Sequence, residues 1–137
     1  MINPDALGPL LKSPDGEHWR AAARGSVSVS HCGDCGHHWF PSSRVCPRCL
    51  GDHVQWQAVS GRATLWSWCE FHKAYFKGTR ELVPYVVVLA ELEEGPKLYG
   101  NLLGTAPDDL KIGMRLEAAF TPAGDDAAMI NFKAVTP

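Results

Sequence analysis

A mostly β fold with one short amino-terminal helix is predicted by three features of this 137-residue sequence. Six segments after residue 53 show the alternation or the β-branched character of strands. The 13 glycines and 10 prolines suit a protein rich in turns better than a helical bundle. Four cysteines stand in two short repeats between residues 32 and 49, where apolar side chains are too few to build a core. The chain is about one domain long.

The helix is expected over residues 13–25. Ser13 can cap it, Pro14 fits the first helical position, and Gly25 ends the stretch. Its apolar face would consist of Trp19, Ala22 and Ala23. An isolated helix of this length is marginal in water. We therefore expect the face to dock within the chain, and a groove on a partner is the alternative.

The cysteines predict a rubredoxin-like metal ribbon over residues 26–53. Their spacing is C-x2-C-x10-C-x2-C, written as CGDCG and CPRCLG. Two tight turns of this kind place four thiolates around one ion, and a closed shell of four cysteines is typical of structural Zn²⁺. Iron in a rubredoxin-like site and a redox dithiol are the alternatives. The predicted ligands are Cys32, Cys35, Cys46 and Cys49, with the neighbouring histidines left as solvated loop residues.

The remaining residues, 54–137, predict a five-stranded barrel of the OB type. Residues 54–71 are taken as one long strand bent at Gly61, which a glycine permits as a bulge or bend. Residues 85–90 have the pattern of a strand buried on both faces. A short turn or helix is expected at residues 108–110. The other strands are expected at residues 85–92, 97–103, 115–121 and 129–135.

The chain is thus expected to have three parts. A helical segment over residues 1–25 is followed by the zinc ribbon over residues 26–53 and the OB-fold domain over residues 54–137.

Charge and composition exclude several classes of protein. The formal net charge of −2 gives no general attraction to nucleic acid or acidic membranes. No apolar run approaches the length of a membrane span. The first twelve residues lack the basic and apolar segments of a secretory signal, which predicts a cytoplasmic protein. In that reducing compartment the cysteines are expected to bind metal rather than to form disulfides.

No convincing set of catalytic residues is found. Cys69 and His72 are three positions apart on a predicted strand and would face opposite sides. Cys69 is therefore expected to be a small buried hydrophobe. Glu70 and His72 share a face, so an acid/base pair is the weaker alternative. Trp66 and Trp68 are assigned to one strand face, as core residues or as a patch for a partner.

The loop over residues 72–80 is the best candidate for binding an anionic ligand. Its cations could hold phosphates while its aromatic rings stack on a base. A solvated hairpin loop is the alternative. The opposite loop carries Asp125 and Asp126, which would repel a polynucleotide lying across both loops. The candidate residues are Lys73, Tyr75, Phe76, Lys77 and Arg80.

The order of these features resembles a bacterial and archaeal zinc-ribbon OB-fold family, domain of unknown function thirty-five. The ribbon CGDCGHHWFPSSRVCPRC is shared by many proteins. The segments SGRATLWSW, PYVVVLAEL and LKIGM carry the specific part of the resemblance. It extends over nearly the whole chain, from about Trp19 to Val135.

This resemblance implies a non-catalytic subunit that works beside acyl-coenzyme A enzymes of the thiolase superfamily. The expected partner is a thiolase or a lipid-transfer-protein-type aldolase in steroid or aromatic side-chain degradation, and an acyl-CoA hydratase is a further option. A hetero-oligomer is implied, with structural zinc and with a coenzyme A thioester shared with the partner. The rival hypothesis is an OB-fold protein that binds single-stranded nucleic acid, which the acidic loop and the net charge oppose.

Overall fold

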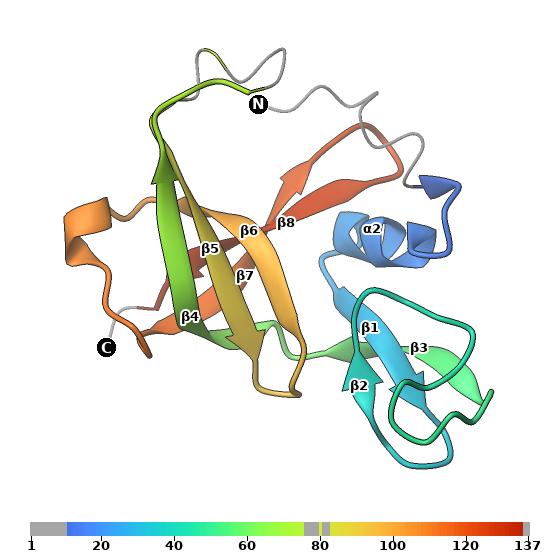
Figure 1. Ribbon diagram of the computed structural model, residues 1–137. Coiled ribbons are helices and arrows are strands. Elements are labelled where there is room, and N and C mark those ends of the chain that lie inside the picture. Colours follow the sequence, from blue (N-terminus) through green and yellow to red (C-terminus); the bar gives the residue numbers. More distant parts are fainter. Residues whose placement is uncertain (1–10, 76–79, 81–82, 136–137) are drawn as a thin grey trace.

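The computed structural model describes residues 11–75, 80 and 83–135 (Figure 1). One α-helix, eight strands and one 3₁₀ turn are found in these residues. In chain order they are α2 (Gly16–Ala23), β1 (Val27–Cys32), β2 (His38–Trp39), β3 (Val54–Val59), β4 (Arg62–Phe71), β5 (Tyr85–Leu92), β6 (Lys97–Leu103), η2 (Pro107–Asp109), β7 (Arg115–Pro122) and β8 (Ala128–Ala134).

The strands form two units. A three-stranded sheet of order β2-β1-β3 carries the cysteine loops, and a closed barrel of order β4-β5-β6-β8-β7 follows it. Within the barrel β6 and β8 run parallel and the other pairs are antiparallel. The predicted fold class, a helix and a zinc ribbon before a five-stranded OB-type barrel, is therefore confirmed. No helix among the described residues has the length and apolar character needed to cross a membrane.

The single bent strand predicted over residues 54–71 is wrong. β3 pairs along its whole length with β1 of the ribbon, whereas β4 pairs with β5 and β7 of the barrel. Gly61 lies between them with φ +78°, a conformation that costs a residue with a Cβ atom. Pattern alone marks both segments as strands but does not tell which sheet each one joins. The division of the chain into three domains stays a prediction.

The barrel interior is filled by alternate residues of each strand. Along β5 the side chains of Val86, Val88, Ala90 and Leu92 are buried and those between them are only partly covered. Phe132 of β8 is fully buried and packs close to Gly100 of β6. A Cβ at Gly100 would lie 2.9 Å from the Phe132 ring, so the glycine lets the two strands approach each other.

Helix α2 docks within the chain, against β8 and β1, as Figure 1 shows. Its buried face differs from the predicted one: Ala21, Ala22 and His18 are buried, while Ala23 is exposed. The predicted Ser13 cap and the helix start at Pro14 are wrong: α2 begins at Gly16 with Asp15 at the N-cap position and no side-chain cap. Ser13 Oγ accepts from the Asp15 N–H at 3.2 Å in the turn before the helix.

His18 is a buried polar residue on this helix. Its Nδ1 donates to the Ser28 carbonyl oxygen at 2.8 Å, because a carbonyl oxygen only accepts. The ring packs against Phe40 with 4.2 Å between centroids. Burial lowers the pKa of His18, against the opposing effects of the Ser28 hydrogen bond and the Asp15 charge. The ring is therefore held neutral where it joins the helix to the ribbon.

We expect this arrangement to make stability depend on pH. The unfolded chain binds a proton at His18 near pH 6.5, whereas the folded chain binds it only at lower pH. The stabilisation that comes from neutral His18 is therefore fully present above about pH 6.5. Below that pH the free energy of unfolding falls, by at most about 1.4 kcal/mol per pH unit for one proton. His18→Asn keeps a donor without the titration. Urea unfolding between pH 5 and 8 should show a shallower pH slope for this variant; equal slopes would contradict the assignment.

Candidate functional site

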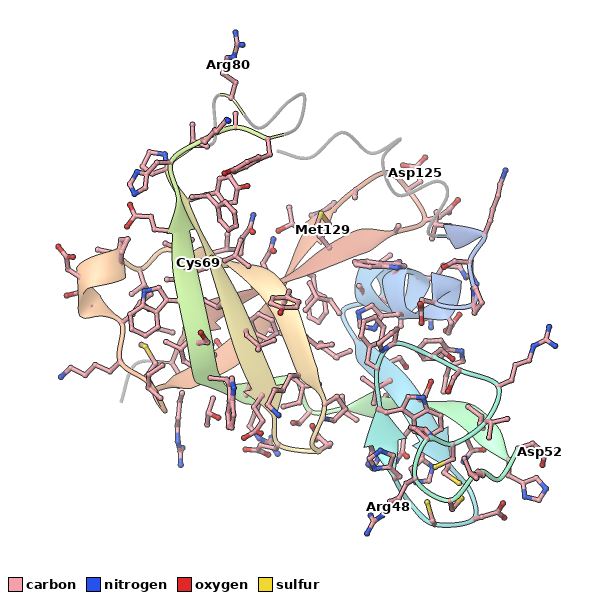
Figure 2. All side chains as sticks on the ribbon, viewed as in Figure 1. Arg48, Asp52, Cys69, Arg80, Asp125 and Met129 are labelled. Atoms are coloured by element: carbon pink, nitrogen blue, oxygen red, sulfur yellow. The ribbon has the colours of Figure 1, made fainter. Side chains whose placement is uncertain are left out.

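The four predicted ligand cysteines converge at the end of the ribbon that lies away from the barrel (Figure 2). Cys32 ends β1, Cys35 lies in the turn before β2, and Cys46 and Cys49 lie in the long loop between β2 and β3. All four sulfur atoms lie within 4.8 Å of one another. Cys32 and Cys46 are buried, and Cys35 and Cys49 face solvent.

The sulfur positions fit a tetrahedral metal ion. Cys32 Sγ lies 3.5 Å from Cys49 Sγ, and Cys35 Sγ lies 3.7 Å from Cys46 Sγ. A tetrahedron with Zn–S bonds of about 2.3 Å requires sulfur separations of about 3.8 Å. Zn²⁺ bound there would have a complete shell of thiolates, with no position left for substrate. The site therefore suits structural rather than catalytic metal.

The backbone around the thiols favours their charged form. The N–H groups of Asp34, Arg48 and Gly51 each point at a cysteine sulfur at 3.4 Å. Burial opposes ionisation of Cys46, but backbone N–H donors and neighbouring thiols outweigh it and lower the pKa of Cys46 to about 7. At Cys49 the Gly51 N–H also lowers the pKa, but the neighbouring thiols outweigh it and raise the pKa to about 12. The donors thus favour thiolates, and the four thiols without metal do not all ionise together. Hydrogen bonds of this kind orient the ligands of a metal and stabilise its thiolates.

The two cysteine turns share one backbone geometry but end on different residues, Gly36 and Leu50. In the first turn the Gly36 N–H donates to the Cys32 carbonyl, and in the second the Leu50 N–H donates to the Cys46 carbonyl, both at 2.9 Å. Gly36 has φ +80° and Leu50 has φ +64°. Leu50 is thus a residue with a Cβ atom in the left-handed backbone region, and 75% of its surface is exposed. The glycine that this geometry favours is replaced here by a solvent-facing leucine.

We expect Leu50→Gly to stabilise the folded chain. Removing the left-handed strain should raise the free energy of unfolding by about 1–2 kcal/mol. The greater conformational freedom of glycine in the unfolded chain lowers it by about 0.4–1 kcal/mol. The net gain is at most about 1.5 kcal/mol, measurable by denaturant unfolding of the zinc-loaded protein. Leu50→Ala keeps the strain and serves as the control. A glycine variant less stable than the alanine variant would contradict this interpretation.

The histidines near the ribbon lie outside the metal shell. His53 Nδ1 lies 2.7 Å from Asp34 Oδ1, and this bond raises the pKa of His53. His31 and His38 contact the side chains of Gln55 and Gln57 on the neighbouring strand. Among the residues that the structure describes, the four cysteines form the group with the geometry of a metal site.

The predicted ligand loop is described only in part. Lys73 Nζ lies 5.3 Å from the centroid of the exposed Tyr75 ring. Arg80 points away from the barrel at the end of the molecule where Asp125 also lies (Figure 2). Phe76 and Lys77 lie outside the described residues. Binding of coenzyme A by this loop stays a prediction.

The prediction that Cys69 is buried is wrong. Its side chain is exposed on β4, on the face turned away from the barrel interior (Figure 2). It pairs with Val87, and the buried side chains of β5 lie at the positions on either side of Val87. Glu70 and His72 do approach each other, with 3.5 Å between Oε1 and Nε2, at an exposed edge. The His72 side chain is 72% exposed and that of Glu70 34%.

The assignment of Trp66 and Trp68 to one strand face is also wrong. The pairing of β4 with β5 shifts between Leu65 and Ser67, so Trp66 occupies a bulge. Trp68 packs against the barrel core, while Trp66 faces outward with 52% of its surface exposed. One inserted residue reverses the alternation.

The structure has a cleft of about 330 Å³ that the sequence did not predict. It lies between α2, the ribbon loop at Phe40 and Pro41, and the first half of β6. Its walls come from segments far apart in the chain, so no local pattern indicates it. The lining is largely apolar: Trp19, Phe40, Pro41, Leu98, Tyr99 and Ile130, with His18 and Lys97.

The fold and the four-cysteine centre define a zinc-ribbon OB-fold protein. Residues 19–55 match the rubredoxin-like zinc ribbon domain of ChsH2, and residues 56–121 match the ChsH2 C-terminal OB-fold domain. The chain is 33% identical over 96 residues to a "DUF35 domain-containing scaffold protein" of Methanocaldococcus jannaschii, covering 69% of this chain and 67% of the relative. The chain belongs to this DUF35 family.

Two further relatives are named for enzyme assemblies. A "Probable enoyl-CoA hydratase alpha subunit" of Thermomonospora curvata is 30% identical, with 98% of this chain matching 42% of that protein. A chain in a solved structure described as "Ltp2-ChsH2(DUF35) aldolase" superposes with a TM-score of 0.76 at 28% identity, covering 89% of this chain and 95% of that chain.

Proposed function

We propose that this chain is a non-catalytic subunit of an acyl-CoA thiolase or thiolase-like aldolase complex. The observation that carries the proposal is its likeness, over 95% of that chain, to the DUF35 chain of the Ltp2-ChsH2 aldolase. The name "scaffold protein" of the archaeal relative points the same way. On this proposal the bonds are broken by the partner.

The chemistry of the described residues supports a non-catalytic role. The cysteine centre offers four ligands, so a tetrahedral ion there has no position for substrate. Cys69 is exposed, and the Glu70–His72 pair lies at the solvent-exposed surface. General acid/base groups are normally enclosed where their pKa values can be tuned. These groups lack such surroundings.

The finer proposal concerns the reaction. A relative from Mycobacterium tuberculosis, 36% identical over 67 residues, is named for a pregnadiene-carboxyl-CoA hydratase. Together with the aldolase name, this favours carbon–carbon cleavage of a steroid or aromatic side chain held as a CoA thioester. The cations Lys73 and Arg80 would meet the nucleotide phosphates at the partner boundary.

The test is co-expression of the tagged chain with each thiolase-superfamily protein of its own organism. We expect one of them to form a complex with this chain by size-exclusion chromatography, and to cleave its acyl-CoA substrate faster in the complex than alone. A complex with a hydratase subunit instead would favour the second kind of partner. Full cleavage activity without this chain, and no complex, would disprove the proposal.

A further inference from the structure

The outward face of the sheet β4-β5-β6 is the feature that the fold leaves unexplained. Residues paired across neighbouring strands lie on the same face. Leu89 of β5 pairs with Ser67 and with Tyr99, and Val87 pairs with Cys69 and with Asn101. We call this the outer sheet face, made up of Thr64, Trp66, Ser67, Cys69, Phe71, Tyr85, Val87, Leu89, Glu91, Lys97, Tyr99, Asn101 and Leu103.

The outer sheet face has the composition of a covered surface. An antiparallel sheet with one face in water carries polar residues on that face. Here Tyr99 is 74% exposed, Trp66 52% and Leu103 39%, and Phe71 stacks on Tyr85 with 5.2 Å between centroids. The sequence pattern of residues 85–90 itself predicts a strand buried on both sides. Among the described residues, the inner side of β5 is buried and its outer side is only partly covered.

The face continues into the cleft beside α2. Lys97 and Tyr99 of β6 belong to both, because they point outward from the sheet and also line the cleft. β6 pairs with β8 at Leu102 and Leu103, and its first half borders the cleft. A broad apolar face next to a pocket for one anchoring side chain is the arrangement of protein–protein hot spots.

Charge indicates the class of partner. The two charged residues of the face, Glu91 and Lys97, pair with each other at 3.6 Å. Lys97 Nζ also lies 4.4 Å from the centroid of the Trp66 ring. The single cation of this face is therefore already engaged, whereas binding of a nucleic acid needs several free cations along its phosphates. A neutral, aromatic-rich face with few charges matches the core of a protein interface.

The exposed area suits a partner of substantial size. Buried aromatic side chains contribute about 150–250 Å² each, so the open parts of Tyr99 and Trp66 alone amount to roughly 200–300 Å². With the aliphatic residues between them, the face reaches several hundred Å², comparable to the roughly 800 Å² per partner of a standard interface. Patches of this kind mark interaction sites.

We propose that the outer sheet face and the adjoining cleft bind the thiolase-like subunit of the complex, whose surface places one large apolar side chain in the cleft beside Tyr99. This assignment rests on the proposed function, since the partner is the one named there. On this assignment the interface is formed mainly by the barrel. The metal centre contributes indirectly, by holding the ribbon loop that places Phe40 and Pro41 on the cleft wall.

The test uses the co-expressed complex and two charge substitutions on the face, Tyr99→Asp and Trp66→Asp. Ile112→Asp is the matched control, because Ile112 is 64% exposed and lies outside the face. Loss of a hot-spot residue costs at least about 2 kcal/mol, or about 30-fold in Kd. We expect at least that weakening for both face variants, measured by biolayer interferometry, and less than about threefold for the control. Zinc content and circular dichroism confirm that each variant folds.

The outcomes separate this assignment from the proposed function. If the native chain binds a thiolase-like subunit and both face variants bind it as tightly as the control, the surface is wrong and the function stands. If the native chain binds none of these subunits, both are wrong. Self-association of the purified chain that Tyr99→Asp abolishes would assign the face to a second copy instead. Salt-dependent binding of oligothymidylate that Tyr99→Asp abolishes would assign it to nucleic acid; either result overturns the proposal.

Discussion

The Cys46→Ser chain is expected to bind no zinc at neutral pH and to lose the structure of the cysteine end of the ribbon. The small cluster of Cys32, Trp39, Cys46 and Val54 is the apolar core at the cysteine end of the ribbon, and it is too small to hold the cysteine loops in place. Val27 and Val29 of β1 pack in the barrel core instead. Structural zinc supplies about 10–16 kcal/mol of apparent binding free energy in small zinc domains. Loss of any of the four ligand cysteines should cost about as much.

The loss is measurable in three ways. Metal analysis should give one zinc per native chain and less than about a tenth of that for the variant, and the near-ultraviolet circular dichroism of Trp39 should collapse. A chelator should produce the same change in the native chain. Cys69→Ser is the control, since Cys69 is exposed on the barrel and should leave zinc content unchanged. A native chain that holds iron, or a Cys46→Ser chain with full zinc, would contradict the assignment.

Phe132→Ala is expected to cost about 3–5 kcal/mol of the free energy of unfolding. The ring is fully buried in the barrel between β6 and β7, and the backbone at Gly100 is shaped to receive it. Its removal leaves a cavity that these rigidly paired strands cannot close. Because a small domain has only about 5–15 kcal/mol in total, the variant should lie close to its unfolding threshold at physiological temperature.

Guanidinium unfolding of the zinc-loaded protein tests this expectation. Phe120→Ala is the matched comparison, because Phe120 lies on β7 at the margin of the same core and is only half-buried. Its loss should cost less than half as much. Equal costs for the two variants would show that the packing around Gly100 does not determine barrel stability.

Local patterns predict the elements well. Alternation and β-branching place the strands at residues 85–92 and 97–103, and the structure has the same bounds for β5 and β6. The cysteine spacing predicts a metal site because the geometry of two turns is local to a few residues. In both cases the physical cause lies within a short window of sequence.

The errors come from effects that act across the fold. β3 carries the pattern of a strand but joins the ribbon, because its pairing depends on β1, which lies on the far side of the cysteine loops in the sequence. The bulge at Trp66 reverses the faces of β4, so Cys69 faces outward instead of inward. His18 has no sequence signal at all, since its burial needs α2, β1 and Phe40 together. Residues 85–90 have the sequence pattern of a strand buried on both faces. The outward face of this strand fits the surface that we propose for the partner.

The docking of α2 on β8 has a consequence for how the chain is made. During synthesis α2 is made before every strand and β8 after all the other strands, so the apolar face of the helix stays uncovered until the whole barrel has been made. The ribbon needs residues only as far as β3 and can capture its metal ion while the barrel is still being synthesised. We therefore expect the nascent protein to fold from the ribbon outward, with α2 and β8 coming together in the final step.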